Sequence, residues 1–76
     1  MNKQRRSNLE SVIRDIRSSA YAVDRAKDEE YDSMMNLPEN LSNSDRYTAM
    51  EDAVDNLGDA IGNLEEAIEN IEAAIS

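Results

Sequence analysis

The chain has 76 residues, of which 17 are acidic and 8 are basic, so its formal net charge at pH 7 is −9. It contains neither cysteine nor histidine, which excludes disulfide bonds, Cys/His zinc sites and catalysis by a histidine base or a cysteine nucleophile. No apolar run is long enough for a membrane span, and no apolar segment follows the basic start as a signal peptide requires, so we expect a cytoplasmic protein.

A first helix is predicted from about residue 3 to residue 35. Its apolar residues recur at the spacing of one helix face, with an interruption at Lys27. These residues are Leu9, Ile13, Ile16, Ala20, Val23, Tyr31 and Met34. No glycine or proline lies between Lys3 and Met35, so nothing in this stretch would end the helix. Residues 1–27 carry a net charge of +4, which makes the start of the chain basic.

A loop is predicted at residues 36–44, where the sequence is NLPENLSNS. Pro38 has no backbone N–H to donate, and it disfavours the helical conformation of Leu37. Either Ser42 or Ser44 is expected to cap the N-terminus of the next helix, with Asp45 in its first turn.

A second helix is predicted from about residue 45 to residue 75, and it follows a seven-residue repeat. Apolar residues occupy positions a and d throughout, and alanines 53, 60, 67 and 74 occupy position g. The apolar stripe therefore covers more of the helix than a two-stranded coiled coil needs. We expect oligomer contacts from the a and d residues Tyr47, Met50, Val54, Leu57, Ile61, Leu64, Ile68 and Ile71.

These elements predict an all-α fold in which residues 1–76 form one domain, an antiparallel, coiled-coil-like hairpin of two helices. The charges favour this orientation. The basic start of the first helix and the glutamates at the end of the second both oppose their helix macrodipoles, and side by side they would neutralise each other. Counting outward from the loop, Ile13 would lie near Ile68.

Self-association is expected because a lone hairpin would leave much of both apolar stripes exposed. We expect a homodimer in which two hairpins form a four-helix bundle. A higher oligomer and a hairpin completed by a different protein are the alternatives.

The chain has few side chains that could act as catalytic groups or metal ligands, so we expect no enzymatic activity and no bound metal or other cofactor. The acidic run DEEYD at residues 28–32 lacks the ligand spacing of a calcium loop. The two glycines, Gly58 and Gly62, lie inside the second helix and form no phosphate-binding loop. They lie off the core positions, where they are either tolerated in a long helix or allow another backbone or a partner side chain to come close.

A dense group of acids near the loop is the candidate binding surface. Residues 28–55 carry a net charge of −8 and could imitate the phosphates that nucleic-acid-binding proteins hold with lysine and arginine. The residues expected to contact such a partner are Asp28, Glu29, Tyr31, Asp32, Glu39, Asp45, Glu51, Asp52 and Asp55. Alternatively, the acids form a solvated face and the tyrosines cover a small core under the loop. Direct nucleic-acid binding by the basic start is not expected, because the net charge repels a polyanion.

Three segments of the chain combine into a recognisable pattern. Met1–Arg6 match a basic M-N-K-x-R-R start, Asn36–Leu41 and Ser44 match an N-(L/M)-P-E-N-L-x-x-S loop, and Arg46–Leu57 match R-x-x-x-M-E-(E/D)-A-(V/I)-D-x-L. In these segments the sequence resembles a group of small acidic helical proteins encoded by phages and prophages of Gram-positive bacteria.

The resemblance implies a phage-encoded, non-enzymatic inhibitor of host defence, of the kind that includes anti-CRISPR proteins. Its partner would be a host defence protein such as a Cas nuclease, in the cytoplasm of the host cell. The alternative is a structural or assembly module that acts through homo- or hetero-oligomerisation of its apolar stripe.

Overall fold

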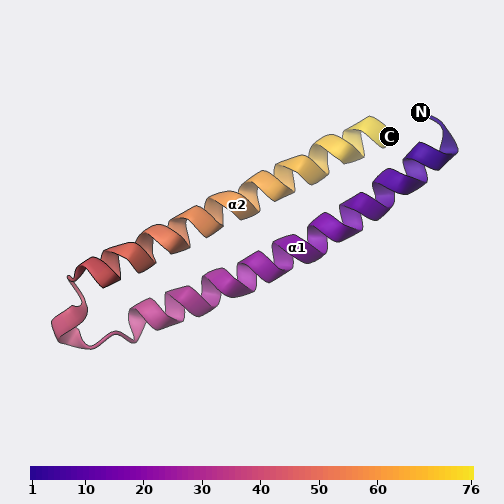
Figure 1. Cartoon of the computed structure of the whole chain (residues 1–76). Helices are drawn as coiled ribbons and strands as arrows, with labels where there is room; N and C mark the ends of the chain where they lie inside the picture. Colours follow the sequence, from indigo (N-terminus) through magenta and orange to yellow (C-terminus); the bar gives the residue numbers. More distant parts are fainter.

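The computed structural model describes all 76 residues as two long helices joined by a short loop. Helix α1 spans Lys3–Met35 and helix α2 spans Asp45–Ile75, with a 3₁₀ turn, η1, at Glu39–Leu41 between them. The helices pack antiparallel along their length and form a rod whose Cα atoms extend over 59 × 15 × 12 Å (Figure 1). The predicted all-α hairpin is confirmed, and both helices have the predicted limits.

Side chains cap the first turn of each helix. The Oδ1 of Asn2 accepts a hydrogen bond from the backbone N–H of Arg5 at 2.8 Å, and the Oγ of Ser44 accepts one from Tyr47 at 3.2 Å. Each bond satisfies a backbone donor that the helix itself leaves unpaired. Of the two candidate caps for the second helix, Ser44 is therefore the one used.

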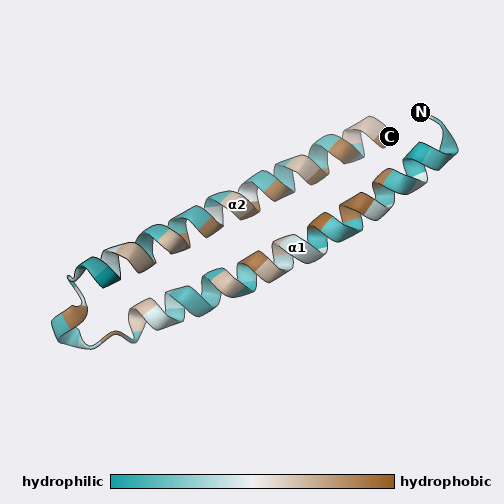
Figure 2. Ribbon diagram, in the orientation of Figure 1, coloured by the Kyte–Doolittle hydropathy of each residue, from teal (hydrophilic) through white to brown (hydrophobic).

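The core of the hairpin is a thin seam between the helices. Only Ile13, Met34 and Ile68 are buried, with 5–7% of their surface exposed. The other apolar residues on the facing rows remain partly exposed, and Figure 2 shows hydrophobic segments recurring along both helices between hydrophilic ones. Each helix covers only the strip of its partner that faces it. The rest of each apolar stripe therefore stays accessible to solvent.

Two charged residues interrupt the apolar seam near the loop. Lys27 and Glu30 occupy the inward row of α1 between Val23 and Met34, and both are half-buried. The Nζ of Lys27 lies 3.5 Å from the Oδ1 of Asp24, one turn earlier on the same helix. The charged head of Lys27 is thus held at the edge of the seam, while its aliphatic stem can cover the apolar row.

The register of the hairpin differs from the one that counting outward from the loop predicts. Ile68 lines a cleft with Arg17 and Ala20, whereas Ile13 lines the next cleft with Glu72 and Ile75. Figure 1 shows the consequence: α2 begins beyond the end of α1 at the loop, and α1 begins beyond the end of α2 at the termini.

The loop explains this stagger. Successive short turns, in which Leu41 donates to Pro38 and Ser44 donates to Leu41, occupy the segment between the two helices. The segment is therefore not a symmetric reversal, and α2 starts farther along the rod than α1 ends. Ile13 therefore lies beside Glu72 and Ile75, and Ile68 lies in the adjacent cleft, which shares Arg17 and Glu72 with it.

Neither helix contains a stretch that is both long enough and apolar enough to cross a membrane.

Candidate partner-binding surfaces

The heptad positions divide the hairpin into two long faces. When Ile13 and Ile68 are assigned to heptad position a, Arg17 and Glu72 both fall at position e. Arg17 and Glu72 form the one ion pair between the helices, with 3.4 Å between Nη2 and Oε1. The e positions of both helices therefore share one side of the seam, and the g positions share the other. We call the side formed by positions e and b the charged face, and the side formed by positions g and c the uncharged face.

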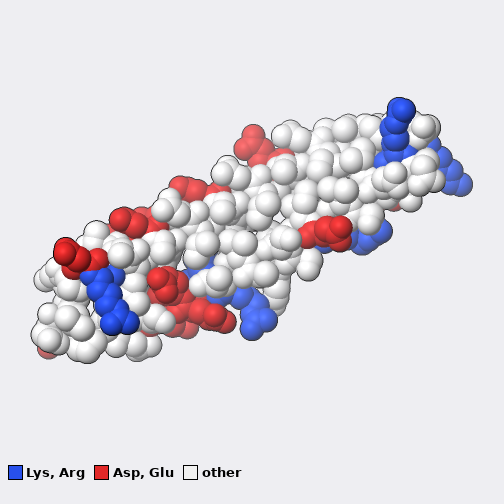
Figure 3. Space-filling model, viewed as in Figure 1, with Lys and Arg blue, Asp and Glu red and all other residues white.

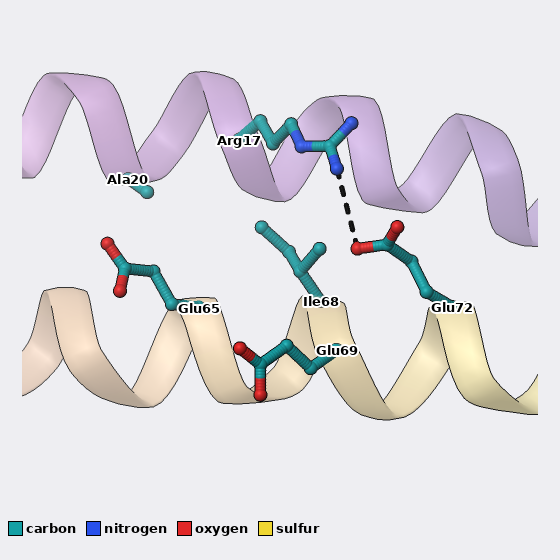
Figure 4. Close-up of a pocket in the computed structure, with 6 residues that line it drawn as sticks. All are labelled: Arg17, Ala20, Glu65, Ile68, Glu69 and Glu72. Atoms are coloured by element: carbon teal, nitrogen blue, oxygen red, sulfur yellow. Dashed lines mark hydrogen bonds and ion pairs between the residues drawn. The ribbon is translucent and has the colours of Figure 1, made fainter.

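The charged face carries a row of shallow clefts along the seam. The cleft at Ile68, about 400 Å³ in volume, lies between Arg17 and Ala20 of α1 and the glutamates of α2. Figure 4 shows Arg17 reaching across to Glu72, with Ile68 between the helices and the carboxylates of Glu65 and Glu69 pointing away from the ion pair. The cleft is open and lined by three carboxylates and one guanidinium, so it can attract cationic side chains but encloses no ligand.

Acidic residues gather at the loop end of the rod. We call this group the acidic loop end: Asp28, Glu29, Asp32, Glu39, Asp45, Glu51, Asp52 and Asp55. All eight side chains are exposed, and none lies within ion-pair distance of a lysine or arginine. Figure 3 shows red clusters concentrated toward the loop on both edges of the rod. The carboxylates therefore repel one another without internal compensation.

The hairpin brings only part of this group onto one face. Asp28, Glu51 and Asp55 stand at b and e positions and share the charged face with Tyr31, which is 48% exposed. The f-position acids lie on the two outer edges of the rod instead, and Glu29, at position c, lies on the uncharged face. Tyr47, by contrast, is half-buried at the start of α2. A partner that contacts all the predicted residues must therefore wrap around the loop end.

The basic start of α1 extends past the end of α2. Lys3, Arg5 and Arg6 are exposed and form no ion pair. The expected neutralisation by the acidic end of α2 occurs instead at Arg17 with Glu72, nearer the middle of the rod. The stagger of the helices is the reason, because it leaves the first turns of α1 without a neighbouring helix (Figure 1).

The residues predicted to make oligomer contacts lie on the row that faces α1 within the same chain. Ile68 is buried there, and the other members of the row are half-buried. The row therefore builds the hairpin first, and only its remaining exposed surface is free for a second contact.

The uncharged face was missed by the sequence reasoning, which noted only the alanines at g. From α2 it contains Ala53, Ala60 and Ala67 at g and Asn56, Asn63 and Asn70 at c, with no charged residue after Arg46. From α1 it contains Val12, Ser19, Ala22 and Ala26, together with the charged residues Arg5 at g and Asp15 and Glu29 at c. The asparagines at every seventh position were the signal that could have revealed it. Figure 3 views a long face of the rod on which a broad uncharged band runs between the charged side chains.

The two helical glycines face open space. A Cβ atom added at Gly58 or Gly62 would meet no other atom within 4 Å. Close approach of the neighbouring helix therefore does not explain them.

No three acidic side chains converge anywhere in the chain in a way that could hold a metal ion. Comparison of the chain with protein-family models, with curated proteins and with solved structures finds no match.

Proposed function

We propose that this protein is a non-enzymatic inhibitor that binds the nucleic-acid-binding surface of another protein through its acidic loop end. The partner class that the phage-like segments suggest is a host defence protein such as a Cas nuclease. In this proposal the carboxylates occupy the positions that nucleic-acid phosphates would otherwise take, and the hairpin serves as a rigid support.

One observation carries the proposal: the eight exposed carboxylates at the loop end have no basic partner within the chain. Such a concentration of like charge costs stability, so a hairpin selected for folding alone would gain from interspersed lysines. A channel lined with lysine and arginine would relieve the repulsion on binding. Electrostatic attraction of this kind also accelerates association and weakens as salt is added.

Self-association forms the second part of the proposal. Two hairpins that pack as a four-helix bundle would cover the half-buried apolar rows and leave the acids at f and b positions free.

A structural or assembly role is the competing function, and one observation favours it: only three residues of the hairpin are buried. In that case the apolar stripe itself is the functional surface, and the acids serve for solubility.

The test uses purified Cas nucleases, with cleavage of a target DNA duplex as the readout. The unmodified protein should inhibit at least one nuclease at low salt, and inhibition should weaken strongly at higher salt. A variant with Asp28, Glu51 and Asp55 changed to lysine should lose inhibition. The matched control changes the same number of acids to lysine toward the other end of α2, at Glu65, Glu66 and Glu69, which leaves the Arg17–Glu72 ion pair in place, and it should inhibit almost normally.

Two results would overturn the acidic-mimic proposal. One is inhibition that persists unchanged in the loop-end variant, and the other is inhibition that is insensitive to salt. A protein that inhibits no nuclease in the panel but still forms dimers would favour the assembly role.

A further inference from the structure

The hairpin exposes more surface than a compact protein of its mass. Its solvent-accessible area is 5604 Å², whereas a folded monomer of 8.5 kDa typically exposes about 4,650 Å². The excess of roughly 950 Å² is close to the ~800 Å² that each partner contributes to a standard protein interface. One additional contact with a second copy would therefore bring the exposed area to the usual range.

Apolar side chains remain accessible on both sides of the seam: Tyr21, Tyr31 and Met35 stand at positions b and e of the charged face, and Val12 stands at position g of the uncharged face. All three buried residues stand at position a. The d-position residues are half-buried, among them Ile16 and Val23 on α1 and Leu57 and Leu64 on α2, and so are the other apolar a-position residues of α2. Around a helix, position d is next to g, so the d-position side chains border the uncharged face and not the charged one.

The same side carries few charged side chains that a second copy would remove from water. Past Arg46, α2 presents only alanine and asparagine at positions g and c. From α1, Asp15 and Glu29 stand at position c, at the outer rim of the face, where they can stay hydrated. Covering the charged face instead would desolvate the carboxylates of Glu65, Glu72 and their neighbours, which is costly without new partners.

The distribution of charge along the hairpin also favours one of the two directions, parallel or antiparallel, in which two copies can pack. The half that holds both termini, residues 1–23 and 65–76, has five basic and six acidic side chains, a net of −1. The loop half, residues 24–64, has three basic and eleven acidic side chains, a net of −8. Parallel pairing would place −8 against −8, whereas antiparallel pairing places −8 against −1 twice. Repulsion grows with the product of the charges, so it is several-fold smaller in the antiparallel arrangement.

We infer that two copies of this chain pack antiparallel through their uncharged faces, with the loop end of each beside the termini of the other. This inference rests on the self-association in the proposed function and specifies its face and direction. In this arrangement the unpaired basic residues Lys3, Arg5 and Arg6 lie near the acidic loop end of the second copy, while the acids on the charged face and outer edges remain accessible.

The face is tested by two single substitutions that each add one glutamate to α2. Asn63→Glu places the charge on the uncharged face at an exposed position outside the hairpin seam, and Ala73→Glu places it on the outer edge. Sedimentation equilibrium should show the dimer dissociation constant raised about tenfold or more by Asn63→Glu and less than about twofold by Ala73→Glu. Circular dichroism should show unchanged helicity for both variants, because neither residue packs in the seam.

The direction is tested with a spin label on Asn43→Cys, which becomes the only cysteine of the chain. Antiparallel copies should place the two labels at opposite ends of the assembly, at a separation that approaches the 59 Å length of the rod. Parallel copies would place both labels at the same end of the assembly, with their backbones separated by roughly the 8–10 Å between neighbouring helices.

The outcomes separate the two proposals. Equal effects of the two glutamate substitutions, or a short distance between labels, would overturn this inference while leaving a dimer in place. A monomer at all concentrations would overturn the proposed self-association and this inference together. Neither outcome depends on the nuclease assay, which tests the acidic loop end.

Discussion

Replacing Ile68 with alanine tests whether the few buried side chains carry the stability of the hairpin. Ile68 is 7% exposed and lies against α1 at Arg17 and Ala20. Alanine removes every side-chain carbon beyond Cβ, and at about 0.8 kcal/mol per buried carbon the transfer loss is roughly 2.4 kcal/mol. Any cavity that the open seam cannot close adds to this loss, so we expect the free energy of unfolding to fall by about 2–4 kcal/mol.

Thermal unfolding followed by circular dichroism measures the effect at one fixed protein concentration, because self-association also raises the melting temperature. In a chain of this size each kcal/mol lowers the melting temperature by about 4–8 °C, so Ile68→Ala should lower it by roughly 8–30 °C. The matched control is Ile75→Ala, the same change at the same heptad position in the last turn of α2, where the side chain is only half-buried. It should lower the melting temperature by less than half as much.

Equal shifts for Ile68→Ala and Ile75→Ala would show that burial in the seam does not determine stability. A shift below about 4 °C for Ile68→Ala would have the same meaning, because it corresponds to less than about 1 kcal/mol. Either result would refute the idea that the side chains buried in the seam hold the two helices together.

Three further predictions concern local features. Gly58→Ala and Gly62→Ala should each raise the free energy of unfolding by up to about 1 kcal/mol, since a methyl group at either position meets open space. A lower free energy of unfolding in urea denaturation would show that the helix is constrained there. Ser44→Ala should lower the free energy of unfolding by about 1 kcal/mol because it removes the cap of α2, whereas Ser44→Asp, which can accept the same bond, should be nearly neutral. A double-mutant cycle with Arg17→Met and Glu72→Gln should give a coupling energy of less than about 1 kcal/mol, since both side chains are more than half exposed. A larger coupling energy would mean that the ion pair is shielded from solvent, as in a dimer that covers the charged face.

The two faces have different consequences for function. The charged face and the outer edges present the carboxylates that a basic partner would contact, and the uncharged face presents the surface that a second copy would cover. Of the acids predicted to contact a partner, only Glu29 stands on the uncharged face, so the overlap is small and self-association and partner binding can occur together. Substitutions on one face should therefore leave the other activity intact, which makes the two roles experimentally separable.

The helices, their limits and their antiparallel packing were predictable from the sequence. The seven-residue repeat in the second helix, the absence of breakers between Lys3 and Met35, and Pro38 in the loop act through neighbouring residues, so they can be recognised without knowing the fold. The acids of the candidate binding surface were also correctly placed at the loop end, because they are close in sequence to the loop itself.

The register and the pairing of charges could not be predicted in this way. They depend on how far the chain advances along the rod between Asn36 and Ser44, and short loops of similar composition can adopt turns of different geometry. The stagger decides that Arg17, and not the basic start, meets Glu72, and it leaves Lys3, Arg5 and Arg6 unpaired.

The sequence by itself thus determined two amphipathic helices, the break between them and the segregation of charge along the chain. Tertiary structure decided the register, the ion pair between the helices and the separation of a charged face from an uncharged one. The physical reason is the range of the interactions. Helix periodicity and capping are set within a few residues, whereas the exposure and pairing of a side chain depend on groups that are distant in the sequence and meet only when the hairpin closes.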